Sequence, residues 1–351
     1  MSVDVDEPDR AQGCPSPRES YTLLGHEAAE QAFEDAHQSG HMHHAWMICG
    51  PRGIGKATLA YRMARRMLGA KPDADYGVLG ADPTDPVSLR IAAMSHGDLL
   101  VLRRPFDEKR KRWRGEITVD EVRRMAGLFQ TRAGEGGWRV CIIDAADEMN
   151  LNAANAILKM LEEPPTNAMV ILVAHAPGRL PATIRSRCRR LDLRPLSQDL
   201  TRKIAMDNGA DDKDADLASQ LAAGSPGRAL SIMASDGTSL WKEVDQLVSR
   251  GAGVGQGVAH ALSRRLALVK AAPQRKLFFE LLLLRLEQEI RAGTAAQAST
   301  NLEPWFALRG RVQSLASDVD RLYLDPAQVV YEAIQDIWRT VSAHRVQRRG
   351  V

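Results

Sequence analysis

The chain has 351 residues, of which 44% are hydrophobic and 26% are charged, a composition typical of a globular protein with two or three domains. Its 47 Lys and Arg residues nearly balance 44 Asp and Glu residues, which leaves a formal net charge of +3. This near balance excludes a polycation that coats nucleic acid along its whole length, while local basic patches remain open.

Hydropathy and cysteine spacing exclude two further classes, membrane-spanning proteins and proteins held together by disulfides or zinc. No apolar run approaches the roughly 18 residues of a membrane-spanning helix, because Glu280 and Arg285 interrupt the richest segment, 277–286. We interpret that segment as core or as a contact between subunits. The spacing of the four cysteines, at positions 14, 49, 141 and 188, matches neither a disulfide framework nor a zinc knuckle. We therefore expect a cytoplasmic protein with reduced thiols, no membrane contact and no resident metal.

In chain order, residues 1–19 are rich in Asp, Pro, Ser and Arg and predict a disordered arm. Apolar strands and helices then alternate. Strands are predicted at 46–49, 99–102, 139–144, 169–174 and 189–193, and helices at 27–38, 57–68, 119–130 and 152–163. Because the strands are apolar on both faces and are separated by helices, we expect an α/β domain over residues 20–196, with a parallel sheet flanked by helices.

The strand signal ends near residue 196. Residues 197–238 predict a group of short helices, and residues 239–351 predict a second, wholly helical domain with apolar stripes at 277–290 and 329–341. We place domain boundaries near residues 196 and 238.

The strongest motif is the stretch 50–58, GPRGIGKAT, which follows a predicted strand and opens a predicted helix. Gly50, Gly53 and Gly55 let backbone N–H groups turn toward an anion, and the helix N-terminus adds partial positive charge. This stretch, called the phosphate loop below, is typical of a site where Lys56 reaches the β- and γ-phosphates of a nucleotide. A glycine-rich turn without a ligand is the alternative interpretation.

Two positions depart from a hydrolytic site. The residue after Lys56 should offer a hydroxyl to Mg²⁺, but it is Ala57, and Thr58 comes one residue late, about 100° around the helix. The strand 140–144 ends in Asp144, the acid expected near Mg²⁺, but the next residue is Ala145 rather than a Glu that polarises water. Together these departures predict a nucleotide-binding fold that has lost its chemistry.

A third motif is Ser186-Arg187-Cys188, directly before the last predicted strand. The planar, permanently charged fork of Arg187 suits a phosphate oxygen. Taken alone, the tripeptide favours an ordinary solvated or ion-paired arginine.

In this order the motifs resemble the clamp-loader AAA+ family. The resemblance rests on HHAW at 43–46, the phosphate loop, DAADEMNLNAANAILKMLEEPP at 144–165 and IRSRC at 184–188, and it spans about 21–230. It implies an AAA+ core over 20–196, a small helical lid over 197–238 and a helical collar over 239–351.

The resemblance also implies roles for single residues. Arg187 would enter the ATP site of a neighbouring subunit as an arginine finger in trans. Arg228, in GSPGR at 224–228, would face a nucleotide held by this chain, while the place near Ala174 and His175 lacks the usual Thr or Asn. Residues 70–98 contain no cysteine, so the zinc module of some relatives is not expected.

The function implied is a non-hydrolysing arm of the DNA polymerase III clamp loader, part of a polymerase holoenzyme but without its own ATPase activity. Its expected partners are the gamma/tau and delta subunits in a hetero-oligomeric ring, and indirectly the sliding clamp and primed DNA. No cofactor is required, and whether ATP or ADP binds as a structural ligand stays open. The alternative is an active AAA+ ATPase, either a motor subunit or a remodeller.

Segment 103–114 gathers basic residues around Phe106 and Trp113, namely Arg103, Arg104, Lys109, Arg110, Lys111, Arg112 and Arg114. A DNA contact is one interpretation. A solvated hairpin, whose charge Asp107 and Glu108 reduce, is the favoured one. The irregular spacing of histidines 26, 41, 43 and 44 favours packing or surface roles over metal binding.

Overall fold

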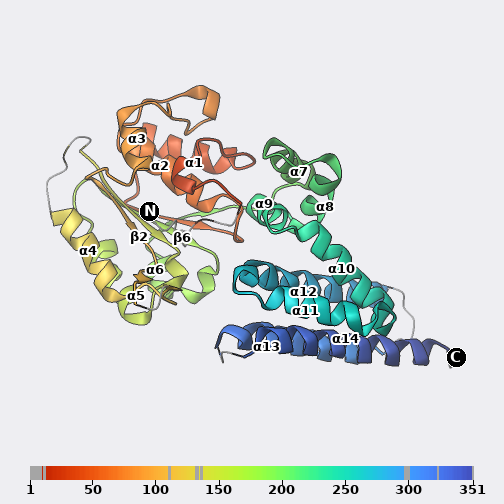
Figure 1. Cartoon of the computed structure of the whole chain (residues 1–351). Coiled ribbons are helices and arrows are strands. Elements are labelled where there is room, and N and C mark those ends of the chain that lie inside the picture. The colour runs from red at the N-terminus through yellow and green to blue at the C-terminus, as the bar shows by residue number, and fades with distance from the viewer. Residues whose placement is uncertain are drawn as a thin grey trace. The chain divides into compact units, whose positions relative to one another are not determined.

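A computed structural model of the chain describes residues 10, 13–109, 112–130, 134, 137–295, 301–321 and 324–349. Two compact units are present (Figure 1). The first comprises Met1–Gly209 and Ala222–Leu230, and the second Ala210–Leu221 and Ser231–Val351. The helices expected as a lid are thus divided between the units, and the three-domain boundaries at 19, 196 and 238 stay predictions.

The first unit is built on a five-stranded sheet flanked by helices. Its main strands are β1 (Ala45–Cys49), β2 (Leu99–Leu102), β5 (Arg139–Asp144), β6 (Ala168–Ala174) and β7 (Arg189–Asp192). Its helices of seven or more residues are α1 (Glu27–Gln38), α2 (Lys56–Met67), α3 (Pro86–Ala92), α4 (Val119–Gln130), α5 (Leu151–Glu162) and α7 (Gln198–Asp207), and the short α6 (Ala182–Arg185) precedes β7. The predicted strands and helices of this region are confirmed to within a residue or so at each end.

All five strands run parallel, in the order β2-β5-β6-β1-β7. Every residue of β1, β5 and β6 is buried, because helices cover both faces of the sheet. The parallel α/β fold class expected from the apolar strands is confirmed.

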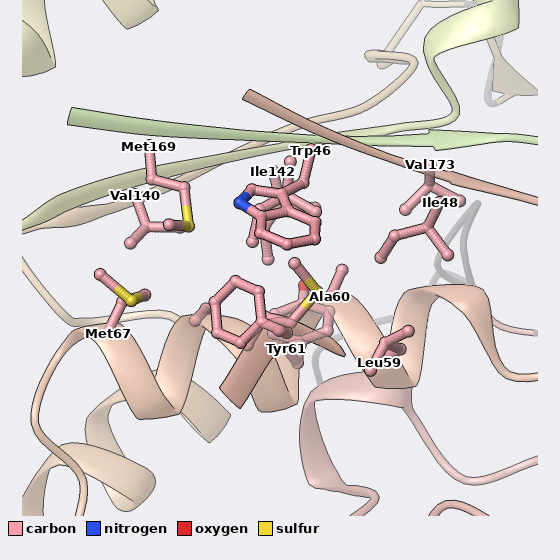
Figure 2. Packing of buried hydrophobic residues seen from close by; sticks show 14 of the residues in the cluster. Trp46, Ile48, Leu59, Ala60, Tyr61, Met67, Val140, Ile142, Met169 and Val173 are labelled. Carbon is pink, nitrogen blue, oxygen red and sulfur yellow. The ribbon is translucent and has the colours of Figure 1, made fainter. Parts of the chain in front are cut away.

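Alternation along each strand divides the core in two. On β1, Trp46 and Ile48 face a cluster that includes Leu59 and Tyr61 of α2, as Figure 2 shows. The alternate residues Ala45, Met47 and Cys49 face the opposite cluster, with residues of α4, α5 and α6. In Figure 1, α1, α2 and α3 accordingly lie on one side of the sheet and α4, α5 and α6 on the other.

Arg62 of α2 is almost fully buried, at 1% exposed, because several groups surround its guanidinium. Its Nε lies 2.5 Å from Oε1 of the buried Glu30 on α1. Its Nη2 donates to the carbonyl oxygen of Tyr76 at 2.7 Å, and its Nη1 donates to that of Tyr21. A buried charge needs such complete pairing, so Arg62 ties three separate segments together.

Part of the segment expected as a disordered arm has a defined place. Residues 13–20 contain a short 3-10 turn with Pro17 buried. The Arg18 Nε donates to the Ala92 carbonyl at 2.7 Å, and the Arg18 carbonyl accepts from the buried Arg65 of α2. The polar composition of this segment predicted disorder. Its contacts could not be predicted, because they use backbone carbonyls, which are present in any sequence. Residues 1–9 and 11–12 lie outside the described residues.

Helix α3 and the strands of the basic segment were not among the strands and helices predicted from periodicity. Helix α3 begins at Pro86, and the Asp85 carboxylate caps it by accepting from the backbone N–H groups of Val87 and Ser88. An Asp-Pro pair at a helix start is a recognised signal, which the apolar periodicity alone did not bring out. Strands β3 (Phe106–Asp107) and β4 (Arg112–Trp113) form the hairpin that was the favoured interpretation of the basic segment.

The second unit is helical. It holds most of α8 (Asp212–Ala222), the end of α9 (Pro226–Ala234), and α10 (Gly237–Arg250), α11 (Gln256–Ala267), α12 (Ala272–Ala295), α13 (Glu303–Arg321) and α14 (Pro326–Arg349). Helix α12 packs on α10 and α13, and α14 packs on α10, α11 and α13. Among the described residues, no helix combines the length with the hydropathy that crossing a bilayer requires.

Replacing Arg62 by Met is expected to lower the free energy of unfolding by about 3–5 kcal/mol, because Glu30 would remain buried without its cation. Urea-induced unfolding measures this loss. Arg66, one turn further along α2, pairs with the Glu34 carboxylate but is 27% exposed. Arg66→Met should therefore cost about 1 kcal/mol or less. Equal effects of the two substitutions would contradict the assigned role of Arg62.

Candidate phosphate site and surface arginine

The site lies at one edge of the sheet. Strand β6 separates β1 from β5, and because the strands are parallel their carboxyl ends meet at this edge. Cys49 of β1 pairs with Ala174 of β6, and Asp144 of β5 pairs with Val173. The segments that follow the three strands therefore lie together, in the position where open parallel sheets bind ligands.

The phosphate loop has the backbone that its glycines predict. Gly50 and Gly53 have φ values of +147° and +76°. A Cβ at Gly50 would lie 2.5 Å from the carbonyl oxygen of Leu193. Only glycine fits there without a shift of the backbone. The loop then leads into α2, which begins at Lys56.

Lys56 is buried, at 2% exposed, and its Nζ donates to the Pro51 carbonyl oxygen of its own loop at 2.5 Å. Burial lowers the pKa of Lys56 to about 8, while the charge of Asp144 opposes this shift. The cation that would meet a phosphate is thus present, held inside the loop, and costly to keep charged.

Both catalytic departures fall at this edge. Ala57 lies in the first turn of α2, where a magnesium-binding hydroxyl would be needed. Asp144 is buried at the end of β5, and Ala145 follows it with a methyl side chain. Lys56 and Asp144 are therefore each followed by a methyl group, where a magnesium-binding hydroxyl and a water-polarising acid would be needed.

Glu148, one of two acids beyond the strand tip, is occupied by ion pairs. Its Oε1 lies 2.8 Å from Nη2 of Arg52 in the phosphate loop, and its Oε2 lies 2.8 Å from Nε of Arg104. This bridge was not predicted from the sequence. No local pattern signals it, because Arg52 and Arg104 belong to distant segments.

Asp147 and His175 form a second arrangement that was not predicted. The Asp147 carboxylate accepts from the backbone N–H groups of His175 and Ala176 at 2.8 and 3.1 Å, which fixes the turn after β6. Burial, aided by the charges of Lys56 and Arg52, lowers the pKa of His175 to about 3, so this imidazole is neutral. It occupies the place where the resemblance implied a Thr or Asn.

The segment around Arg228 closes on the phosphate loop. The Ser225 hydroxyl donates to the Arg52 carbonyl at 2.9 Å, and the Gly227 N–H donates to the Gly53 carbonyl at 2.8 Å. A Cβ at Gly53 would lie 2.5 Å from the Ser225 Oγ. The Arg228 backbone N–H donates to that hydroxyl at 3.3 Å. That the Arg228 side chain faces a nucleotide stays a prediction.

Arg187 lies apart from this group, on the turn between α6 and β7. Its Nη2 is 2.8 Å from Glu162 Oε1, and its Nη1 donates to the Thr183 carbonyl at 2.9 Å. The side chain is 35% exposed. Among the described residues it makes no hydrogen bond or ion pair with the phosphate loop.

The two remaining candidate features are the basic segment 103–114 and metal binding. Phe106 and Trp113 stack edge-to-face, with ring centroids 5.2 Å apart across the β3–β4 hairpin. Arg110 and Lys111 lie outside the described residues. Within the part of the chain that is described, no group of three His, Cys, Asp or Glu residues is arranged to hold a metal ion.

Comparison with known proteins finds relatives of a large part of the first unit. The family described as "DNA polymerase III, delta subunit" matches residues 25–197. The DNA polymerase III subunit delta' of Pseudomonas aeruginosa is 40% identical over 145 residues, which is 41% of each chain. That of Escherichia coli is 35% identical over 207 residues, 57% of this chain and 58% of the relative. The matched regions thus span about half the length of these relatives.

A solved structure of a DNA polymerase III gamma subunit-related protein from Thermotoga maritima is similar at 15% identity. It gives a TM-score of 0.45 and covers 90% of this chain and 99% of that chain.

Replacing Lys56 by Met should stabilise the chain near neutral pH. The pKa of Lys56 falls from 10.5 to about 8 on folding, so between these values the folded chain binds fewer protons than the unfolded one. The cost of the buried charge is fully present below pH 8 and disappears as the pH rises toward 10.5. We expect Lys56→Met to raise the free energy of unfolding by about 1–3 kcal/mol at pH 7, less at pH 10.

Urea-induced unfolding at a series of pH values measures this gain. Lys203 is exposed and provides the control, because Lys203→Met should give no pH-dependent gain. A loss of stability in Lys56→Met at pH 7 would show that the ammonium is stabilised where it lies.

Proposed function

We propose that this chain, whose residues 25–197 belong to the delta-prime clamp-loader family of DNA polymerase III, acts as a non-hydrolysing arm of that complex. In this role it assembles with gamma/tau and delta subunits into a ring in the cytoplasm. The ring opens the sliding clamp and places it on primed DNA. No cofactor of its own is required, and no zinc.

The observation that carries this proposal is the chemistry of the phosphate site. Ala57 and Ala145 place methyl groups at the two positions where hydrolysis needs a magnesium ligand and a water-polarising acid. The buried Lys56 still suits a phosphate, so ATP or ADP bound there would act as a structural ligand. The arrangement supports binding without cleavage.

The contribution to hydrolysis would come from Arg187, acting in trans. In the assembled ring its guanidinium would approach the γ-phosphate of ATP held by a neighbouring motor subunit. Negative charge spreads over the equatorial oxygens as the bond to the leaving diphosphate breaks, and an arginine finger there is worth about 10³–10⁵ in rate. The partial exposure of Arg187, away from its own phosphate loop, supports this role.

Arg187→Ala in the full chain, reconstituted with its partner subunits, should leave assembly intact and lower DNA-stimulated ATP turnover. We expect a fall of about tenfold or more at the adjoining site in single-turnover assays, because only that site loses its finger. Arg185, exposed two residues earlier, provides the matched control, and Arg185→Ala should keep normal turnover. Unchanged turnover in Arg187→Ala would refute the trans role.

The isolated chain should show no ATP turnover above background, with or without primed DNA. A labelled nucleotide, followed by equilibrium binding, tests for a structural ligand at the same time. If the isolated chain hydrolyses ATP and Lys56→Ala abolishes this activity, the active-ATPase alternative replaces the proposal.

A further inference from the structure

We propose that Glu162 is the residue that positions Arg187 for its action on the neighbouring subunit. This inference rests on the proposed function, since it assigns a second residue to the same site. Glu162 ends α5, inside the segment that distinguishes the family resemblance, and its carboxylate contacts the guanidinium at 2.8 Å.

The backbone around Arg187 is fixed by its own turn. The Arg187 N–H donates to the Ile184 carbonyl at 3.1 Å, and the Ser186 N–H donates to the Ala182 carbonyl at 2.9 Å. Ile184 is fully buried, and Cys188 packs against the core beneath the sheet. Local structure therefore fixes the backbone of Arg187, but it does not fix the long, flexible side chain.

Two contacts from different elements hold the head of that side chain. Thr183, on α6, offers its carbonyl oxygen to Nη1, and Glu162, on α5, offers Oε1 to Nη2. Two acceptors that bind different nitrogens of a planar guanidinium restrict both its position and its rotation. Only the Glu162 contact joins opposite charges, and only it can be removed by replacing a side chain, since Thr183 contributes a backbone carbonyl.

The guanidinium still has groups to offer a ligand. Of its five N–H donors, one on Nη1 bonds to Thr183, while the Glu162 carboxylate lies against Nη2 as an ion pair. The other three, including Nε–H, have no hydrogen-bond partner among the described residues. Glu162 can therefore remain bound while Arg187 donates to phosphate oxygens, which is what a positioning contact requires.

Glu162 is itself anchored, because α5 buries Ile157 and Leu161 in the core. The next residue, Glu163, follows the helix, is exposed and makes no ion pair or side-chain hydrogen bond among the described residues. The two adjacent acids thus differ in their contact with Arg187 while sharing charge and neighbourhood. This difference makes Glu163 a matched control.

The experiment uses full-length chain assembled with its partner subunits and measures single-turnover ATP hydrolysis with primed DNA. Glu162→Ala should lower the rate constant by about two- to fivefold, as expected for a partly exposed ion pair, and leave the apparent affinity for ATP unchanged. Glu163→Ala should leave both unchanged. In the Arg187→Ala background, Glu162→Ala should have no further effect, because the residue it positions is absent.

The outcomes separate this inference from the proposed function. If Arg187→Ala lowers the rate but Glu162→Ala does not, Glu162 has no positioning role and the proposed function stands. A further fall in the double variant, or a higher rate in Glu162→Ala, also overturns the inference, since Glu162 would then act elsewhere or restrain the finger. If Arg187→Ala has no effect, the proposed function itself fails. Thermal unfolding and assembly of each variant report any general structural damage.

Discussion

A parallel sheet whose three central strands, β1, β5 and β6, are buried along their whole length imposes the constraint on which the first unit depends. Because helices cover both faces of these strands, a ligand can reach them only at their ends, and their carboxyl ends meet at one edge. Lys56, Asp144 and His175 come from three distant parts of the chain, yet the strand register brings them to that edge. The same constraint places Arg187, which precedes the outermost strand β7, on a separate turn.

The charged groups discussed for this unit lie in two different environments, one buried and one partly exposed. Those of Lys56 and Asp144 are buried at the strand edge, where a charge is expensive unless a ligand or a partner compensates it. That of Arg187 remains partly exposed and is held by one carboxylate and one carbonyl. A protein that cleaves its own nucleotide needs the first set to be complete. A protein that assists a neighbour, the role proposed for this chain, needs the second to be accessible.

The phosphate loop is held from outside as well as by its own glycines. Ser225 and Gly227 bond to its backbone carbonyls, and Glu148 pairs with Arg52. These contacts join segments 173 and 96 residues apart in the chain. They engage carbonyl oxygens and one arginine of the loop, and so fix its path from several sides. A loop held in this way suits the binding without cleavage that is proposed for this chain.

Local periodicity was enough to predict the strands, most helices and the phosphate loop, since burial on both faces and glycine spacing are properties of neighbouring residues. Ala57 and Ala145 could be identified as departures from a hydrolytic site in the same way, because each directly follows a motif residue, Lys56 or Asp144. The tertiary structure decided everything that joins distant segments, such as the contact of Glu162 with Arg187 and the place of residues 13–20 against α2. An exposed glutamate or a backbone carbonyl has the same local appearance whether or not it has a partner. Only the fold determines which distant group comes within bonding distance.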